Sequence, residues 1–493
     1  MRYEQLQDSV QLYIADSDHS TLQVFGTITR SSIDTQAMAS VTPSPTILVP
    51  HLPPKTLVGI DLITFTSTPN FHGIRDLPTG WHFLYTGATE SLSLRSGGWF
   101  YVGDISATGS TNDGALIPAP RGSLGPDFIV WKWDTDTETL APLRASDDAD
   151  KQEAMRHKAN LAAVWQSGGL FRFRSRVPLS SEGQTQSRDV DDDENEEEGR
   201  QDWEGLTNRL SPRLFKRIIG DPEIDVDGRP RWMVTSASTA QKDNESIPGI
   251  PEPGQDSNRL ADVIGEQESE FSFLNIDLKR TWREGAIGRE RTEAAQDRSW
   301  ALGDLIQQVS NADQQKSEID EQLGEAQILG ELQFTFLMVL TVMNFSCLQQ
   351  WKRLLGLILT CQRAIKEREQ FISNVLRLLL IQLRRCDDIE GGFFDLDGEE
   401  GGEFLRKLLM KFRTSLYEVI EDAGTLVKED FKELETWVKT EYDWELNHGA
   451  FVRRGMLQLE DGEQVEMDMP DDEDDEMGEY APVVVDLGEG NTL

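Results

Sequence analysis

The segments Gly-Glu-Leu-Gln-Phe-Thr-Phe at 330–336 and Gln-Trp-Lys-Arg-Leu-Leu at 350–355 lie in the most apolar part of the chain, Ile328 to Leu383. Hydrophobic residues in this part recur at spacings of three and four, as they do on one face of a helix. They are Leu348, Trp351, Leu355 and Leu359, followed by Ile372, Val375, Leu376, Leu379, Leu380 and Leu383. The spacing predicts packed helices that carry no catalytic groups.

The chain as a whole is long and strongly acidic. It has 493 residues, with 87 Asp and Glu against 48 Lys and Arg, and a formal net charge of −39. The length favours two domains plus tails, and 38% hydrophobic residues with 12 Trp suffice for substantial cores. A sequence-independent nucleic-acid binder needs Lys and Arg to neutralise phosphates, so the charge argues against that activity. A protein partner with a basic face fits better, and no direct sequence-specific contact with nucleic acid is expected.

The cysteines and the apolar segments indicate the cellular compartment in which the protein is found. Cys347, Cys361 and Cys386 all lie in the helical block without a C-x-x-C pair, which favours buried thiols in a reducing compartment. The first residues, Met1–Gln5, are polar and lack the apolar core of a signal peptide. The apolar run Phe334–Phe345 is shorter than the roughly 20 residues that a bilayer requires. We therefore expect a protein of the cytoplasm and nucleus, without a membrane partner.

Short aromatic and β-branched runs before about residue 145 predict strands. Such runs are Val10–Ile14, Trp81–Tyr85, Trp99–Val102 and Phe128–Trp133. With helices at its end, the segment 1–235 is expected to form a β-rich, sandwich-like N-terminal domain. Asp189–Glu198 is almost wholly acidic, and like charges repel one another and resist burial. A disordered acidic insertion is therefore expected near residues 179–200.

The rest of the chain divides by composition into a linker, a helical domain and a tail. Residues 236–270 mix Ser, Pro, Gly, Asn and Glu with few large apolar groups, which is typical of a flexible linker. Helical spacing then predicts about six helices in an all-α C-terminal domain at 271–450. Residues 451–493 are expected to form an acidic disordered tail. Its segment Ala481–Leu487 suits a short strand that adds to a partner's sheet edge, the alternative being a terminus whose valines are accidental.

Several separated segments resemble, in the same order, the Aar-two family of A-one-cistron splicing factors. In the helical part they are the two segments quoted first, Trp282 with Glu284-Gly285, Ser299–Leu302 and Tyr442–Trp444. In the β-rich part they are Gly59–Asp61, Pro69–Ile74, Leu77–Tyr85 and Val130–Asp134. The chain departs from the family pattern at three places: it has Phe65 for Trp, Thr68-Pro69 for Gly-Pro, and Pro78-Thr79-Gly80 for Pro-Pro-Gly.

The resemblance implies an α+β multidomain protein whose all-α C-terminal domain is similar to the VHS fold. It also implies a non-catalytic assembly chaperone of the U-five small nuclear ribonucleoprotein (U-five snRNP). Such a factor binds the scaffold protein Prp-eight through its RNase-H-like and Jab/MPN domains and delays docking of the helicase Brr-two. Two rigid domains, a flexible connection and a terminal strand would then act as a clamp that binds by avidity.

No enzymatic centre is predicted, so we expect no catalytic residue, cofactor or metal. The chain has no G-x-x-x-x-G-K-[ST], H-E-x-x-H, G-x-S-x-G or C-x-x-C motif. His72 and His82 stand beside aromatic residues without a nearby nucleophile or second metal ligand, which favours structural histidines. Asp395–Glu400 resembles the opening of a calcium loop, but Glu400 and Arg406 replace its required Gly and Glu. Two alternatives stay open: an enzyme of unknown type that uses these residues, and a VHS-like adaptor in membrane traffic.

The candidate functional residues are therefore surface residues. Those for strand addition to Prp-eight are Val483, Val484, Val485 and Leu487. Lys352 and Arg353 can face solvent or an acidic partner, whereas Trp351 continues the apolar stripe and is expected in the core. Four linker serines are candidate phosphorylation sites that alter docking: Ser236, Ser238, Ser246 and Ser257.

Overall fold

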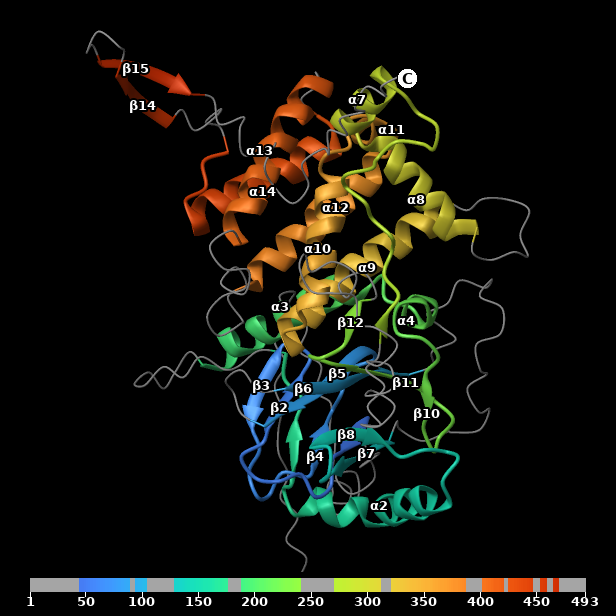
Figure 1. Ribbon diagram of the computed structural model, residues 1–493. Helices are drawn as coiled ribbons and strands as arrows, with labels where there is room; N and C mark the ends of the chain where they lie inside the picture. Colours follow the sequence, from blue (N-terminus) through green and yellow to red (C-terminus); the bar gives the residue numbers. More distant parts are fainter. Residues whose placement is uncertain are drawn as a thin grey trace, which may run out of the picture.

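The computed structural model shows a β-rich region and a helical region stacked end to end (Figure 1). It describes residues 44–88, 94–103, 128–175, 188–240, 270–311, 321–386, 401–420, 424–446, 453–458 and 464–469. The α+β class of the fold is confirmed, while the likeness of the helices to a VHS domain stays a prediction. The expected strand at Val10–Ile14 and the acidic segment Asp395–Glu400 lie outside the described residues.

The β-rich region contains two sheets that face each other. The first has five strands in the order β8-β7-β1-β4-β9, and the second has six in the order β10-β11-β6-β5-β2-β3. Ile47 and Trp131 from the first sheet pack against Phe100 from the second in one buried cluster, so the sandwich-like prediction is confirmed. The strands are β1 (Thr46–Leu48), β2 (Leu57–Ile60), β3 (Ile63–Thr66), β4 (Gly73–Arg75), β5 (Gly80–Gly87), β6 (Arg95–Val102), β7 (Phe128–Asp134), β8 (Thr139–Pro142), β9 (Leu170–Arg172), β10 (Glu223–Ile224) and β11 (Pro230–Thr235).

The central strands β5 and β6 are buried on both faces. Successive side chains of a strand point to opposite faces, and in β5 Trp81 belongs to the cluster shared with the helices while Leu84 belongs to the cluster between the sheets. Trp99 and Phe100 divide in the same way in β6. Burial on both faces explains why these strands read as continuous apolar runs without polar alternation.

Gly59 in β2 allows a close approach of the Tyr85 ring on the neighbouring strand β5. A Cβ atom added at Gly59 would lie 2.0 Å from Cζ of Tyr85. We expect Gly59→Ala to lower the free energy of unfolding by about 1–3 kcal/mol, because the buried ring must be displaced. Urea denaturation followed by tryptophan fluorescence measures this change. Gly424→Ala, at an exposed site where an added Cβ meets nothing within 4 Å, is the control and should change stability little.

Helix α2 (Asp148–Gln166) covers the outer face of the first sheet. Its Ala154 packs with Leu48 and Val130 in a separate buried cluster. Asp147 caps its first turn, since the side chain accepts a hydrogen bond from the N–H of Ala149 at 2.9 Å. Figure 1 shows this helix at the end of the molecule farthest from the helical region.

Helices α3 (Arg188–Thr207) and α4 (Pro212–Ile218) lie on the outer face of the second sheet. The acidic stretch Asp189–Glu198 forms the first half of α3, so the expectation of a disordered insertion was wrong for these residues. The same helix continues into a packed segment, where Trp203 and Leu206 are buried. Helix elongation adds one hydrogen bond for each further residue, so a packed second half supports an acidic first half.

The helical region is built around α9 (Glu321–Val342). Among the described residues α9 is the one helix long and apolar enough to span a membrane, but 89% of its most apolar window is buried within the protein, as in a core helix. The region also contains α7 (Arg289–Gln296), α8 (Ser299–Asn311), α10 (Phe345–Ile358), α11 (Ala364–Glu367), α12 (Glu369–Arg384), α13 (Gly401–Val419) and α14 (Leu426–Tyr442). The three cysteines are buried thiols, as expected.

The predicted linker and tail both contain strands. Both ends of the linker are fixed, because β12 (Thr239–Ala240) pairs in parallel with β13 (Glu270–Phe271). In the predicted disordered tail, β14 (Arg453–Gln458) pairs with β15 (Gln464–Met469), so these residues are not without structure. Residues 241–269 and the strand-like segment Ala481–Leu487 lie outside the described residues.

Candidate partner-binding site at the interdomain junction

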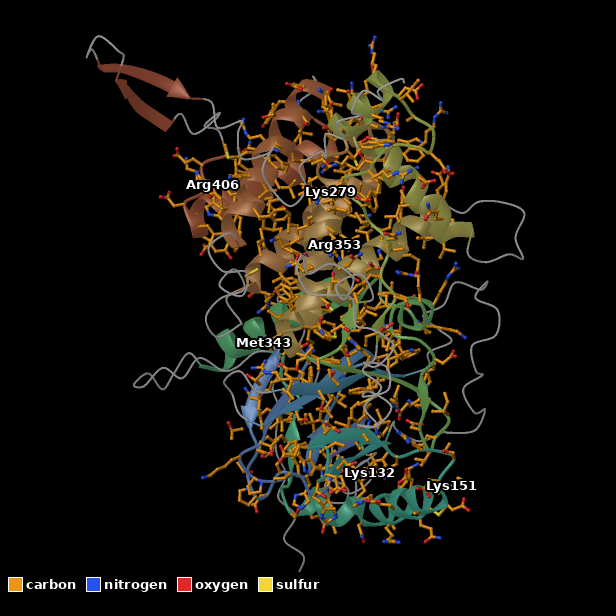
Figure 2. The ribbon with its side chains drawn as sticks, viewed as in Figure 1. Lys132, Lys151, Lys279, Met343, Arg353 and Arg406 are labelled. Atoms are coloured by element: carbon orange, nitrogen blue, oxygen red, sulfur yellow. The ribbon has the colours of Figure 1, made fainter. Side chains whose placement is uncertain are left out.

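The β-rich and helical regions share one hydrophobic core. Trp81, Trp99 and Trp232 of the second sheet belong to the same buried cluster as Phe334 of α9. Phe215 of α4 lies between them, with its ring centroid 5.1 Å from that of Trp232 and 6.1 Å from that of Phe334. A clamp with two independently moving domains is therefore the wrong description of the described residues. Figure 2 labels Met343 at the turn after α9, where the two regions meet.

Glu331 is a fully buried carboxylate at this junction. Its Oε2 lies 2.5 Å from Nη1 of Arg217, which belongs to α4. Its Oε1 accepts hydrogen bonds from the backbone N–H of Leu274 at 3.0 Å and from Nε2 of Gln350 at 2.8 Å. A buried charge is tolerated when it is paired and hydrogen-bonded, and both conditions hold here. Glu331 thus joins three separate segments of the chain.

Gln333, two residues further along α9, binds the last turn of α3 and the segment that connects α3 to α4. Its Nε2 donates to the carbonyl of Gly205 at 2.8 Å and to Oδ1 of Asn208 at 2.9 Å. Its Oε1 accepts the N–H of Arg209 at 2.9 Å. The side-chain amide both donates to and accepts from this segment, so it fixes the position of the segment along α9.

Asn344, just beyond the other end of α9, also joins separate segments of the chain through its side-chain amide. Its Oδ1 caps α10 by accepting the N–H of Cys347 at 2.9 Å, and its Nδ2 donates to the carbonyl of Ser238 at 2.7 Å. Arg95 of β6 adds a hydrogen bond from Nη1 to the carbonyl of Thr341 at 2.9 Å. At a third place, Arg385 Nη2 donates to Oδ2 of buried Asp202 on α3. Directional polar contacts surround the shared core, which makes the junction rigid as well as tight.

A cavity of about 460 Å³ lies between β5, the end of β9 and α3. Ser175 fixes α3 beside it, because its N–H donates to Oε1 of Glu196 at 3.2 Å and its hydroxyl donates to the Glu196 carbonyl. Arg174 and Arg200 line the cavity and are exposed to solvent. With tryptophan, tyrosine and phenylalanine side chains in its wall, the cavity can receive an apolar side chain of a partner.

His82 lines this cavity, and its surroundings favour the protonated form of the ring. Its Nε2 donates to the carbonyl of Pro78 at 2.9 Å, and its Nδ1 lies 2.7 Å from Oδ2 of Asp61. Burial by itself lowers the pKa of His82, but the charge and hydrogen bond of Asp61 and the Pro78 carbonyl outweigh it, so the pKa of His82 is raised. Oδ1 of Asp61 also accepts the N–H of Phe83 at 2.9 Å. Both ring nitrogens are used structurally, as the sequence analysis expected for this histidine.

The ion pair of His82 predicts a dependence of stability on pH. A raised pKa means that the folded state holds the proton more tightly than the unfolded state. The contribution of His82 is therefore complete below its ordinary pKa of 6.5 and is lost as the pH rises through the raised folded-state value. We expect the stability lost in His82→Gln to be largest at about pH 5 and to shrink towards about pH 9, in urea denaturation at each pH. A loss that stays constant across this range would contradict the charged pair, and His72→Gln is the matched control.

His72 is exposed, and its Nδ1 lies 2.8 Å from the carbonyl of Asn70. Within the described ranges, no group of three His, Cys, Asp or Glu side chains is placed to hold a metal ion. The carboxylates of Asp395–Glu400 lie outside these ranges.

The predicted site residues fall into three groups. Lys352 and Arg353 on α10 are half-buried, and Nζ of Lys352 lies 4.9 Å from the ring centroid of Phe404, so Lys352 links α10 to α13 (Figure 2 labels Arg353). Their role in binding a partner stays a prediction. Trp351 is 2% exposed and donates from Nε1 to Oε1 of Gln382 at 3.0 Å, which confirms its expected place in the core.

The serines and the terminal strand make up the other two groups. Ser238 is buried in the junction, with its carbonyl bound to Asn344, and Ser236 is half-buried with its hydroxyl accepting the N–H of Arg95 at 3.1 Å. A flexible, accessible linker was therefore the wrong setting for these two serines. Ser246 and Ser257, and the tail residues Val483, Val484, Val485 and Leu487, lie outside the described residues.

The polar residues of the junction were not predicted as a site. Glu331 and Gln333 stand in the segment quoted first, and a charged residue and an amide inside an otherwise apolar helix were the available signal. Their partners Arg217 and Arg209 lie more than a hundred positions away in the sequence, at 114 and 124 residues.

Comparison with known proteins follows the two regions of the structure. The family model described as "AAR2 N-terminal domain" matches residues 43–220, and the one described as "AAR2 C-terminal repeat region" matches residues 273–447. "Protein AAR2 homolog" from Homo sapiens is 23% identical over 385 residues, covering 77% of this chain and 84% of the human protein. The protein of the same name from Caenorhabditis elegans is 25% identical over 404 residues, covering 79% of this chain and 91% of the relative.

Proposed function

Because this chain belongs to the AAR2 family in both its β-rich and its helical region, we propose that it is a non-catalytic assembly factor of the spliceosome that acts in U-five snRNP biogenesis. The observation that carries the proposal is that the two matched regions are the two sides of one shared core. The family match therefore covers both sides of the junction and not one detachable module.

The proposed partner is Prp-eight, bound through its RNase-H-like and Jab/MPN domains, and the proposed effect is to delay docking of Brr-two. A rigid body supports this role, because a surface that is already ordered loses little conformational freedom on binding. The net charge of −39 favours a partner with a basic face. The cavity beside α3 offers a place where one apolar side chain of the partner is buried.

The tail adds a second contact in this proposal. Val483, Val484, Val485 and Leu487 would pair with a sheet edge of Prp-eight while the rigid body binds elsewhere. Linking two contacts through one chain makes the second contact intramolecular, which raises the total affinity without changing either contact. The clamp therefore consists of one rigid body and one tether.

Calorimetry tests this arrangement with full-length protein and a version that ends at Tyr480. The titrant is the RNase-H-like plus Jab/MPN region of Prp-eight. We expect tight binding by the full-length chain and at least about tenfold weaker binding by the truncated one, because the tether is lost. If neither version binds, the assembly-factor proposal fails, and an adaptor or an enzyme must be considered again. If both bind equally, the body is the binding site and the tail has no part in it.

Regulation and location belong to the same proposal. We place the protein in the cytoplasm and nucleus, which fluorescence microscopy of a tagged chain tests. Ser246 and Ser257 remain the candidates for phosphorylation that alters docking, since Ser236 and Ser238 are engaged at the junction. Phosphopeptide mapping in cells that finds Ser246 and Ser257 unmodified would contradict this part.

A further inference from the structure

Helices α8 and α11 lie in the helical region, apart from the β-sheets (Figure 1). A small hollow lies between α8 and the segment around α11. It encloses about 250 Å³. Five of its lining residues come from α8, Trp300, Gly303 and Asp304 among them, and three come from the α11 segment: Arg363, Glu367 and Arg368. None of them takes part in the junction contacts described above.

Gly303 keeps the hollow open. Residues three and four apart on a helix share a face, so Trp300, Gly303 and Asp304 lie together on α8. Glycine is a poor residue for a helix interior, and at Gly303 no neighbour requires it, because an added Cβ would meet nothing within 4 Å. Gly324 in α9 is different, since its added Cβ would lie 2.4 Å from the carbonyl oxygen of Ile306. Helix packing therefore does not require a glycine at position 303, but a side chain there would occupy the space beside Trp300.

Trp300 supplies an aromatic surface to this space. It is 40% exposed, although its neighbour Leu302 on the same helix is fully buried. Among the described residues, no cation lies over its ring, whereas the exposed ring of Tyr417 already has Arg413 and Lys428 above it. Tryptophan is the side chain whose face attracts cations most strongly.

The charges around the hollow are unequal. Nε of Arg363 lies 2.7 Å from Oδ2 of Asp297. Arg368 is held by two carboxylates, with Nη1 at 3.0 Å from Glu321 Oε2 and at 2.6 Å from Glu325 Oε1. Both arginines that line the hollow are therefore already paired.

Two lining carboxylates are left over. Asp304 accepts a hydrogen bond from the neutral amide of Gln308 at 2.6 Å, and Glu367 is in no ion pair with any residue that the structure describes. Glu367 contributes to raising the pKa of Arg363, but the hydrogen bond that Arg363 donates to Asp297 is the larger cause. An exposed indole and two carboxylates without an ion-pair partner of their own among the described residues, all lining one hollow, are complementary to a cation.

We propose that this hollow binds an arginine side chain from a basic segment of a partner protein. The planar guanidinium stacks on Trp300 and donates hydrogen bonds to Asp304 and Glu367, which a compact ammonium group matches less well. An RNA phosphate is disfavoured because it would face the same carboxylates. The hollow is small enough to select one side chain, and the chain's net charge of −39 draws basic segments towards it. The site does not depend on the proposed role in snRNP assembly.

Saturation-transfer NMR on the full-length protein tests the proposal with N-acetyl-arginine methylamide as the probe. The citrulline compound has the same shape without the charge, and the lysine and glutamate compounds complete the set. We expect the arginine signal to exceed the citrulline signal by about threefold or more, with lysine between them. Equal signals for arginine and citrulline, a lysine signal above that of arginine, or a stronger glutamate signal would overturn the proposal.

Variants then locate the binding. Gly303→Leu fills the hollow from a position with free space and a higher helix propensity, so we expect a folded protein that loses the arginine signal about threefold or more. Trp300→Ala should cause a similar loss. Gly424→Leu is the matched control, because an added side chain there also meets open space but lies outside the hollow. An arginine signal that Gly303→Leu leaves unchanged would place the binding elsewhere and overturn the site.

Discussion

Glu331→Ala is expected to lower the free energy of unfolding by about 3–5 kcal/mol, because it removes a fully buried carboxylate from its ion pair with Arg217, whose side chain is 23% exposed, and also leaves two hydrogen-bond donors without an acceptor. Arg217 loses its carboxylate, and the N–H of Leu274 and the amide of Gln350 lose their acceptor. Water has no access to the position, since Glu331 is 0% exposed. Urea denaturation at neutral pH, followed by tryptophan fluorescence, measures the loss.

Two further variants test whether the loss comes from the burial of the ion pair and from the charge of Glu331. Glu293→Ala breaks an Arg–Glu pair of the same chemistry on the exposed surface of α7, where Glu293 and Arg289 are 58% and 90% exposed, and should cost less than about 0.5 kcal/mol. Glu331→Gln keeps an acceptor for one hydrogen bond but loses the charge, so its cost should lie between the other two. If Glu331→Ala cost no more than Glu293→Ala, the Glu331 network would not be what holds the junction.

The sequence predicted the class of the fold because its periodicities are local. Helical spacing around Trp351 indicates a helix with one buried face, and aromatic runs such as Trp81–Tyr85 indicate buried strands; the structure confirms both. The runs in β5 and β6 lack polar alternation because each strand has an apolar layer on both sides. That absence of alternation was a signal that the sheet is covered, although it did not show which helices cover it.

The joining of the two regions could not be predicted from composition. A segment rich in Ser, Pro, Gly and Glu between two domains is typical of a flexible linker, but its composition says nothing about the surfaces on either side. The pairing of Thr239–Ala240 with Glu270–Phe271 and the burial of Ser238 depend on contacts made far along the chain. The acidic stretch Asp189–Glu198 was misjudged for the same reason, because the support for its helix comes from the packing of Trp203.

The arginine hollow shows a different limit of the sequence. Ser299–Leu302 was quoted for its resemblance to a family. From the sequence alone, Trp300 cannot be distinguished from a core aromatic residue at helical spacing. What distinguishes it is an empty space beside Gly303, together with the pairing of Arg363 and Arg368 by other carboxylates. Space and charge pairing are properties of the folded surface, so sequence spacing could suggest the face but not the hollow.

Residues 1–240 and 270–493, produced as separate chains, are expected not to fold independently. Separation would expose apolar side chains that now pack across the junction, among them Leu214 and Phe215 of one half and Phe334 and Ile381 of the other. Burying one such side chain is worth about 1.5–3 kcal/mol, so exposing four costs an amount comparable to the entire stability of about 5–15 kcal/mol of a typical protein. Each half alone should therefore lack sharp cooperative unfolding in calorimetry and bind a hydrophobic dye.

Cutting the connector while both halves are present is the control for this prediction. A protease site between Asn244 and Ser257, in a full chain that has already folded, leaves the shared core and the bonds of Glu331, Gln333 and Asn344 unbroken. The nicked protein should stay together as one species and unfold in a single transition, at a lower midpoint because the two halves are no longer tethered. Two halves that fold alone, each with its own transition, would show instead that the junction is a docked contact between independent domains. In that case the moving clamp expected from the sequence would again be the better account of how this protein engages its partner.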